Sequence, residues 1–284
     1  MRYTIKTFNE RFPDDDSCLD YMFEQAYGSM PACPKCGVVN PSYYRVKNRK
    51  CYECKDCGNQ IHPLAGTIFH KSSTSLREWF YIIYLYSVSK NGMSAKEVER
   101  HLGVTYKCAW RIAKQVRELM NEGGSPLSGV VETDETYIGG RKRGKDITFQ
   151  DKEIVFGMVE RKGKVKANHV ASAGTRVLLP RLRESVAIGT TVYSDQARVY
   201  STLKRLGYLH ASVNHSTGEY GRGVVHTNTI EGFWGQLKRS INGTYHCVSP
   251  KYLQSYVNEF VYRYNHRQNP IFPVLIASAS RRVR

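Results

Sequence analysis

The sequence predicts a multidomain α+β protein in which a small cysteine-rich module and a helical region precede a mixed-sheet domain. Three observations predict this organisation: two CxxC pairs near the N-terminus, two helical patterns separated by a glycine, and a second half in which strand patterns give way to alternating strands and helices. A chain of 284 residues has room for roughly two or three such units.

The cysteine spacing predicts a zinc ribbon within residues 1–66, after short N-terminal helices. The four candidate ligands are Cys33, Cys36, Cys54 and Cys57. Two CxxC turns suit one tetrahedral Zn²⁺ whose positions are all filled by protein, which is a structural site. Gly37 and Gly58 follow the pairs, where the backbone must turn tightly. Two disulfides are the alternative, and Cys51 falls outside the symmetric spacing.

Residues 67–122 predict a helical region. A strongly apolar helix from Ser75 is followed by Ser94 and Glu97, which are spaced as a capping box. Gly103 then separates this helix from another that runs from about residue 105 to 120. Two short helices around a glycine turn are typical of a helix-turn-helix, although an ordinary helical hairpin has the same pattern. The candidate DNA-facing side chains are Tyr106, Lys107 and Arg111.

Residues 129–284 predict the mixed-sheet domain, after a linker at 121–129. The strand patterns cover 130–140, 153–163, 164–174, 190–195 and 210–215, and the helical patterns cover 175–186, 197–207, 227–241 and 250–267. The order βββαβαβαα is that of the ribonuclease-H-like fold. In that fold the first and fourth strands are neighbours in the sheet.

Positive charge dominates the composition. The 42 Lys and Arg residues exceed the 25 Asp and Glu residues by a net charge of +17. This excess predicts a polyanionic partner, usually nucleic acid, although a charge that serves solubility would look the same. Residues 201–284 contain only three acids, Glu219, Glu231 and Glu259. An acid that remains in so basic a stretch is a candidate for a specific task.

Acids at two strand ends predict a metal site. Asp134 lies in the first strand and Asp195 ends the fourth, so their carboxylates should be neighbours that repel unless a cation lies between them. Glu231, on the helix at 227–241, is the candidate third ligand, and Asn228 and Lys238 share its helix face. We therefore expect two Mg²⁺ or Mn²⁺ ions that serve phosphodiester chemistry.

Each acid also has a simpler interpretation when it is taken singly. Asp134 fits a turn residue, Asp195 fits the N-cap of the next helix, and Glu231 fits a solvated helix acid. Glu132 alternates onto the strand face of Asp134, which makes it a rival or supporting ligand. The joint occurrence of the acids with this fold order and charge favours metal binding.

Several motifs together resemble the Merlin-like DDE transposases of bacterial insertion sequences. They are "CPKCG…CKDCG", "VETDETYIGG", "VYSDQ", "HTNTIEGFWGQLKR", "GTYHCVS" and "EFVYRYNHR", in this order from about Phe8 to Arg267. The resemblance implies binding of terminal inverted repeats, metal-dependent strand cleavage, and joining of 3′ hydroxyls to target DNA. It also implies a homodimer or a higher homo-oligomer on double-stranded DNA.

The same resemblance assigns the site residues. Asp134 and Asp195 match the first two acids of the family, and Lys238 matches a downstream lysine. The third acid falls within "TNTIE", where we favour Glu231 over Asn228 because a carboxylate binds Mg²⁺ better than an amide. The further candidate DNA contacts are Arg141, Lys142, Arg143, His226, Arg239, Arg263 and Arg267.

Two other functions are compatible with parts of the pattern. A zinc-ribbon and helix-turn-helix protein without catalysis would be a DNA-binding regulator, and a ribonuclease-H-like nuclease would act on RNA or branched DNA. The sequence contains no run of roughly 18 apolar residues, so no membrane helix is predicted. Residues 1–16 lack the apolar centre of a signal peptide. We expect a cytoplasmic, nucleoid-associated protein with no membrane partner.

Overall fold

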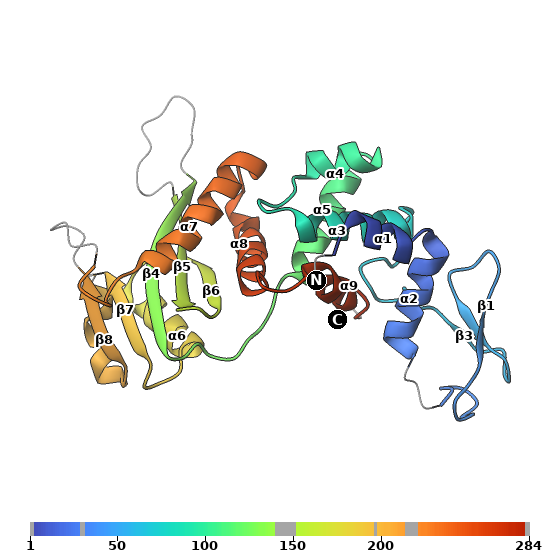
Figure 1. The fold of residues 1–284 in the computed structure, drawn as a ribbon, viewed down its shortest axis with the longest axis horizontal. Coiled ribbons are helices and arrows are strands. Elements are labelled where there is room, and N and C mark those ends of the chain that lie inside the picture. The colour runs from blue at the N-terminus through green and yellow to red at the C-terminus, as the bar shows by residue number, and fades with distance from the viewer. Residues whose placement is uncertain (1–2, 29–31, 140–151, 196–197, 214–220, 282–284) are drawn as a thin grey trace. The chain divides into compact units, whose positions relative to one another are not determined.

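The chain folds into two compact units (Figure 1). A computed structural model describes residues 3–28, 32–139, 152–195, 198–213 and 221–281. The first unit comprises Met1–Ser89, Ala95–Leu119 and Asn269–Arg284, and the second comprises Lys90–Ser94 and Met120–Gln268. Candidate residues Arg141, Lys142 and Arg143 lie outside the described residues.

The first unit contains the ribbon and the helical region in one body. Its helices are α1 (Ile5–Arg11), α2 (Asp15–Tyr27), α3 (Leu76–Val88), α4 (Ala95–Leu102), α5 (Tyr106–Leu119) and α9 (Ile271–Ala279). Its antiparallel sheet has the order β1 (Tyr43–Arg45), β2 (Tyr52–Cys54), β3 (Gln60–Ile61). The module expected at residues 1–66 therefore forms one body with the helices that follow it.

Helix α3 is the centre of this unit. Ser75 caps it by accepting the Glu78 amide at 3.1 Å, while the Glu78 carboxylate accepts the Ser75 amide at 3.0 Å. Trp79 and Phe80 on this helix are fully buried. α9 packs against α3 (Figure 1). It adds the buried ring of Phe272. The chain thus returns to the first unit at its end, so the observed second unit ends before the expected domain of residues 129–284 does.

The helix-turn-helix pattern is present as two short helices that pack on each other. α4 and α5 are joined at Gly103, whose φ of 66° is the left-handed conformation that glycine adopts without steric cost. The buried side of α5 carries Ala109, Ile112 and Val116, at helical spacing. Tyr106 and Lys107, at the start of α5, are exposed.

The second unit is a five-stranded mixed sheet. The strands are β4 (Val130–Gly139), β5 (Lys152–Glu160), β6 (Val165–Val170), β7 (Thr191–Asp195) and β8 (Leu209–Val213), in the order β6-β5-β4-β7-β8. The first three pair antiparallel, and β4, β7 and β8 pair in parallel. The predicted neighbourhood of the first and fourth strands of this domain is confirmed, and the expected mixed sheet is present.

Helices cover both faces of this sheet. One face packs on α6 (Thr175–Ser185) and on η2 (Arg198–Leu206), which is a 3-10 helix where an α-helix was expected. The other face packs on α7 (Asn228–Ser240) and α8 (Pro250–Asn265) (Figure 1). A short π-helical turn, η4 (Ile241–Tyr245), continues α7. Among the described residues, no helix is long and apolar enough to cross a membrane.

Candidate active site and zinc centre

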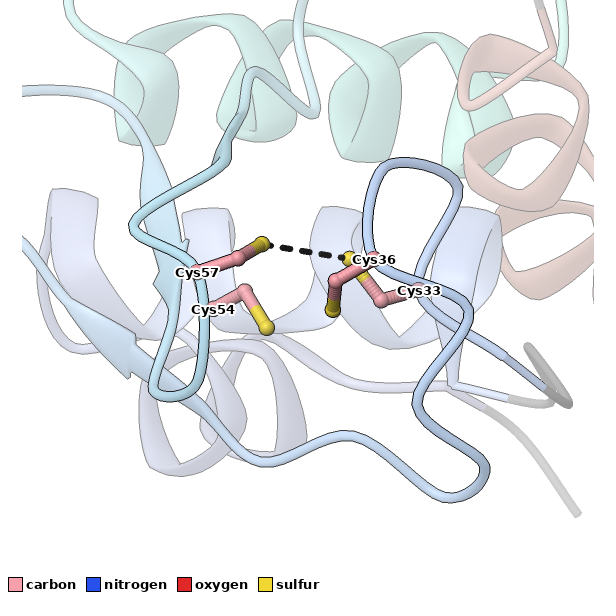
Figure 2. A group of neighbouring side chains, drawn as sticks. All are labelled: Cys33, Cys36, Cys54 and Cys57. Atoms are coloured by element: carbon pink, nitrogen blue, oxygen red, sulfur yellow. Dashed lines mark hydrogen bonds between the residues drawn. The ribbon is translucent and has the colours of Figure 1, made fainter.

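Four thiols of the ribbon converge on one point. Figure 2 shows Cys33 and Cys36 on one loop and Cys54 and Cys57 on another, with their sulfur atoms toward the space between the loops. All four sulfur atoms lie within 4.8 Å of one another, and the Sγ atoms of Cys33 and Cys57 are 3.8 Å apart. Zn–S bonds of about 2.3 Å in a tetrahedron place sulfur atoms about 3.8 Å apart. The cluster therefore fits one structural Zn²⁺.

Both turns of the ribbon are built alike. The amide of Gly37 donates to the carbonyl of Cys33 at 2.9 Å, and the amide of Gly58 donates to the carbonyl of Cys54 at 3.0 Å. Both glycines have positive φ, 73° and 67°, as their place after each CxxC pair predicts. Backbone amides of Cys36 and Lys35 lower the pKa of the Cys33 thiol to about 6, which favours the thiolate that binds metal.

The cysteine outside the symmetric spacing takes no part in the cluster. Cys51 is fully buried and points its thiol to the side-chain oxygen of Gln60 at 3.9 Å. The described four-cysteine group does not include it. The four thiols that the spacing selects are thus the four that lie together in the structure.

Asp134 and Asp195 line one pocket of about 390 Å³ in the second unit. Glu132 on β4 lies opposite Tyr193 on β7, so the two aspartates, each two residues further along a parallel pair, emerge side by side on the same sheet face. The pocket is also lined by Glu135, Tyr137, Ala173, Gly174, Thr175 and Val199. This placement is consistent with the prediction that the sheet brings Asp134 and Asp195 close together.

The environment of Asp134 is crowded with negative charge. Burial, together with the charges of Asp195 and Glu231, raises the pKa of Asp134 to about 6. The indole of Trp234 donates to Asp134 Oδ2 at 3.0 Å and opposes part of this rise. Asp134 and Asp195 offer oxygen ligands of the kind that Mg²⁺ and Mn²⁺ prefer, and Glu231 acts on Asp134 from outside the pocket lining.

Trp234 reaches Asp134 because the neighbouring strand has no side chain there. Gly157 on β5 is paired directly with Asp134 on β4. A Cβ at Gly157 would overlap the Trp234 ring and lie 3.1 Å from Ile230 Cδ1. The glycine therefore makes the space in which helix α7 lies close to the sheet.

Glu132 supports helix α7 and has no oxygen left for a cation. Its side chain is 0% exposed. Oε1 accepts Arg161 Nε at 2.7 Å and Thr229 Oγ1 at 2.8 Å, while Oε2 accepts the amides of Thr229 at 2.7 Å and Ile230 at 3.1 Å. Glu132 shares a strand face with Asp134, as alternation predicts. Its occupied oxygens oppose the interpretation as a substitute metal ligand.

Arg161 extends this support to the segment before α7. It donates to the carbonyls of Val224 at 2.7 Å and His226 at 3.0 Å, and its guanidinium lies 4.8 Å from the ring centroid of Tyr193. The His226 ring is turned toward Glu132, with Nδ1 3.3 Å from Oε1. His226, a candidate DNA contact, is therefore half-buried beside the carboxylate.

The candidate site residues of α7 lie on its exposed side. Asn228, Glu231 and Lys238 are all exposed, whereas Phe233 and Leu237 of the same helix are buried. Glu231 accepts a hydrogen bond from Thr227 Oγ1 at 2.8 Å, and its charge acts on Asp134. Glu231 is thus the acid of α7 whose field reaches the strand carboxylates.

Glu135 is a third carboxylate of the pocket, and the sequence analysis did not single it out. It faces the other side of the sheet from Asp134 and accepts the Tyr200 hydroxyl at 2.7 Å. Burial, with the charges of Asp134 and Asp195, raises its pKa to about 7. The "TDET" run contains the signal, since an acid at each of two successive strand positions places one on each face.

The other candidate DNA contacts differ in their exposure and in the groups that their side chains contact. Tyr106 and Lys107 are exposed at the start of α5. Arg111 lies over Trp79, 5.7 Å from its ring centroid, and Arg239 is exposed on α7. Arg263 turns inward to the buried carboxylate of Glu259 at 2.7 Å.

Arg267, the last of these candidates, is exposed beyond α8. Its guanidinium lies over the Tyr264 ring, 4.1 Å from the centroid, and Nη1 donates to the Tyr264 carbonyl at 2.7 Å. The side chain is therefore held along the end of α8 while one face stays open to solvent.

Two domain families match the chain in the order of its parts. Residues 13–60 match the transposase zinc-ribbon domain of the IS1595 type, and residues 126–265 match the ISXO2-like transposase domain of the same type. The two matches are consistent with an insertion-sequence transposase. These matches, with the relative from a transposable element, confirm the resemblance to transposases of insertion sequences.

Two relatives illustrate the similarity. A protein in transposable element ISH50 of Halobacterium salinarum is 29% identical over 256 residues, which cover 81% of this chain and 84% of that protein. A transposase-like protein of Haemophilus influenzae is 29% identical over 107 residues, which cover 38% of this chain and 85% of that protein.

Proposed function

We propose that this chain is a DNA transposase that binds terminal inverted repeats and catalyses metal-dependent strand cleavage and strand transfer. The observation that carries the proposal is the juxtaposition of Asp134 and Asp195 in one pocket, within the electrostatic reach of Glu231. The zinc-ribbon and transposase families support the same function. Such a protein acts where the DNA is, on the nucleoid in the cytoplasm.

Three acids are the proposed ligands of the catalytic cations. Asp134 and Asp195 offer carboxylates from two adjacent strands, and Glu231 offers one from α7. Two bound Mg²⁺ or Mn²⁺ ions would activate the attacking hydroxyl or water and stabilise the leaving 3′ oxygen. Trp234 donates to one oxygen of Asp134 and so fixes the orientation of its carboxylate. Glu231 is the third ligand in preference to Asn228, because its charge already acts on Asp134.

The basic side chains would hold the DNA. Lys238 lies seven residues after Glu231 and is exposed near that face of α7, where a phosphate beside the acids would meet its ammonium. Tyr106 and Lys107 are exposed on α5, as side chains that enter a DNA groove must be. Strand transfer brings two transposon ends together, so we infer that the active form is at least a homodimer on DNA.

The test uses purified full-length chain and a plasmid that carries the DNA flanking its reading frame. Wild type with Mg²⁺ should cleave at the element ends and join them to a target. Asp195→Ala should bind the same DNA within about twofold and lose at least about 100-fold in cleavage rate, because it lacks a metal ligand. Glu184→Ala, which removes an exposed acid of α6, is the matched control and should cleave normally.

Three outcomes separate the alternatives. Mg²⁺-dependent cleavage by Asp195→Ala at the wild-type rate would overturn the ligand assignment. Wild type that binds the ends and never cleaves them would be a regulator. Wild type that cuts RNA or branched DNA but transfers no strand would be a nuclease.

A further inference from the structure

A cavity in the first unit has a lining suited to an anion and takes no part in the site of the acids. It has a volume of about 450 Å³ and is formed where the ribbon strands meet the segment that leads to α3. Its lining residues are Lys50, His62, Leu64, Ala65, Phe69, His70, Lys71 and Ser72. None of these eight is acidic, and Leu64 and Phe69 form a buried apolar floor.

The polar groups of the lining are hydrogen-bond donors. The amide of Gly66 donates to His70 Nδ1 at 2.8 Å, and a neutral imidazole that accepts at Nδ1 carries its proton on Nε2. Lys50 and Lys71 add two exposed ammonium groups, and His62 is also exposed. These donors and cations suit a ligand that supplies hydrogen-bond acceptors and negative charge.

Ser72 adds a hydroxyl proton and connects the cavity to the helix-turn-helix. Its Oγ accepts the Trp79 indole at 2.8 Å, the Thr74 amide at 3.3 Å and Arg111 Nη2 at 3.5 Å. Within the described chain, no acceptor takes the Ser72 hydroxyl proton. Arg111 belongs to α5, so a cation of the candidate DNA-reading helix lies beside this serine of the cavity.

The backbone at Lys71 also points to a ligand. Its φ is 53°, a left-handed conformation that is uncommon for residues other than glycine. Such conformations persist where surrounding structure fixes them, and they concentrate at binding sites. Here the segment from His70 to Ser72 places three donors in succession along the cavity.

We propose that this cavity binds a backbone phosphate of DNA and thereby joins the zinc ribbon and α5 along one DNA strand. The inference rests on the proposed function, because it assumes a DNA partner, and it adds where the strand is held. Phosphate oxygens accept several N–H and O–H donors at once, which matches the lysines, His70 and Ser72. These contacts carry no base specificity, so they set the position of the protein on any sequence.

The test compares wild type with Lys50→Ala/Lys71→Ala in the full chain. Binding to a short duplex of mixed sequence is measured by fluorescence anisotropy over a series of KCl concentrations. Each lost phosphate contact should reduce the slope of log Kd against log [KCl] by about 0.9, which is about eightfold in Kd at 0.1 M salt. The effect should be the same for duplexes of unrelated sequence.

A matched control removes two charges elsewhere. Lys6→Ala/Lys251→Ala changes two exposed lysines, on α1 and α8, that do not line the cavity. Equal slopes for the two double variants would overturn the proposal, because net charge alone would then explain the loss. Zinc content and thermal unfolding of both variants should equal those of wild type, which keeps folding out of the comparison.

Inorganic phosphate separates the DNA backbone from a free anion. Phosphate that binds wild type by calorimetry, together with DNA binding unchanged in Lys50→Ala/Lys71→Ala, would assign the cavity to the free anion and overturn the DNA assignment. If wild type cleaves element ends and Lys50→Ala/Lys71→Ala binds DNA normally, only this inference is refuted and the proposed function stands. A reduced salt slope in the variant, with no cleavage by wild type, would keep the inference and refute the transposase.

Discussion

The backbone amide of Thr229 donates to the buried carboxylate of Glu132 at 2.7 Å. This bond ties the first turn of α7 to strand β4, two residues before Asp134 on the same strand face. The positive end of the helix dipole and the guanidinium of Arg161 both stabilise the charge of Glu132. The position of Glu231, on that first turn of α7, therefore depends on Glu132.

Replacing Glu132 should impair cleavage through the position of Glu231. Glu132→Gln keeps the shape but removes the charge that pairs with Arg161, and breaking a buried pair costs about 3 kcal/mol. We expect a lower free energy of unfolding in urea, a cleavage rate at least about tenfold lower, and DNA affinity within twofold of wild type. Mg²⁺ titration of the cleavage rate should show a higher half-saturating concentration.

The double variant Glu132→Gln/Arg161→Met distinguishes a specific pair from general damage. If the two side chains act as a unit, the urea-unfolding cost of the double variant will be smaller than the sum of the two single costs. Additive costs, or a Glu132→Gln enzyme with wild-type Mg²⁺ dependence, would contradict the positioning role.

Sequence reasoning predicted which strands carry the two aspartates and which thiols form the cluster, because the order of elements and the residue spacing can be read along the chain. The βββαβαβαα order placed β4 beside β7, and this pairing brings Asp134 and Asp195 together. The CxxC spacing likewise selected the four thiols and left out Cys51. In each case a short repeat of backbone geometry decides which side chains meet.

The supporting contacts depend on pairings that no local pattern reveals. Glu132 and Asp134 have the same two-residue periodicity, yet one meets the N-terminus of α7 and the other meets the indole of Trp234. Which acid faces which group follows from how α7 crosses the sheet, and Gly157 on a third element permits that crossing. No helix was predicted after residue 267, so the sequence reasoning missed both α9 and its burial in the first unit.

Adding a methyl group at Gly157 should disturb the site, although Gly157 does not line the pocket. Gly157→Ala would overlap the Trp234 ring, so α7 must shift, and overpacking of this kind costs about 1–3 kcal/mol. We expect a lower urea midpoint and altered Trp fluorescence. Gly232→Ala is the matched control, because α7 has open space there and alanine should stabilise the helix by up to about 1 kcal/mol. Equal effects at both glycines would refute close packing of α7 on β5.

The raised pKa values predict how pH acts on the metal-free protein. Asp134 titrates near pH 6 and Glu135 near pH 7 in the folded chain, against ordinary values of 3.8 and 4.5. The folded state therefore binds protons more tightly than the unfolded state, so its stability is greatest below about pH 4 for these groups and falls as pH rises to 7. For Asp134 alone the loss amounts to about 2–3 kcal/mol.

Mg²⁺ should reverse that loss where the carboxylates are ionised. Thermal unfolding followed with and without MgCl₂ should show a larger increase in Tm at pH 8 than at pH 5, because protons compete with the cation for Asp134. Asp134→Asn should flatten both the pH dependence and the Mg²⁺ effect. The same Mg²⁺ shift at both pH values would show that the cation binds elsewhere.

Loss of one zinc ligand should unfold the ribbon and weaken DNA binding, while loss of a neighbouring buried thiol should not. Cys54 and Cys51 lie three residues apart and are both 0% exposed, but only Cys54 belongs to the four-sulfur cluster. We expect Cys54→Ser to contain less than one zinc per chain by mass spectrometry and to lose protection of the ribbon from protease, since metal binding stabilises such small modules directly. Cys51→Ser should retain zinc and DNA affinity, at a cost of about 1 kcal/mol for burying a hydroxyl. Full retention of zinc by Cys54→Ser would refute the four-thiol cluster. Equal loss of zinc from both variants would mean that the ribbon tolerates no change in its core. Resistance of wild-type zinc to a chelator, which four thiolate ligands should give, is therefore the second measurement.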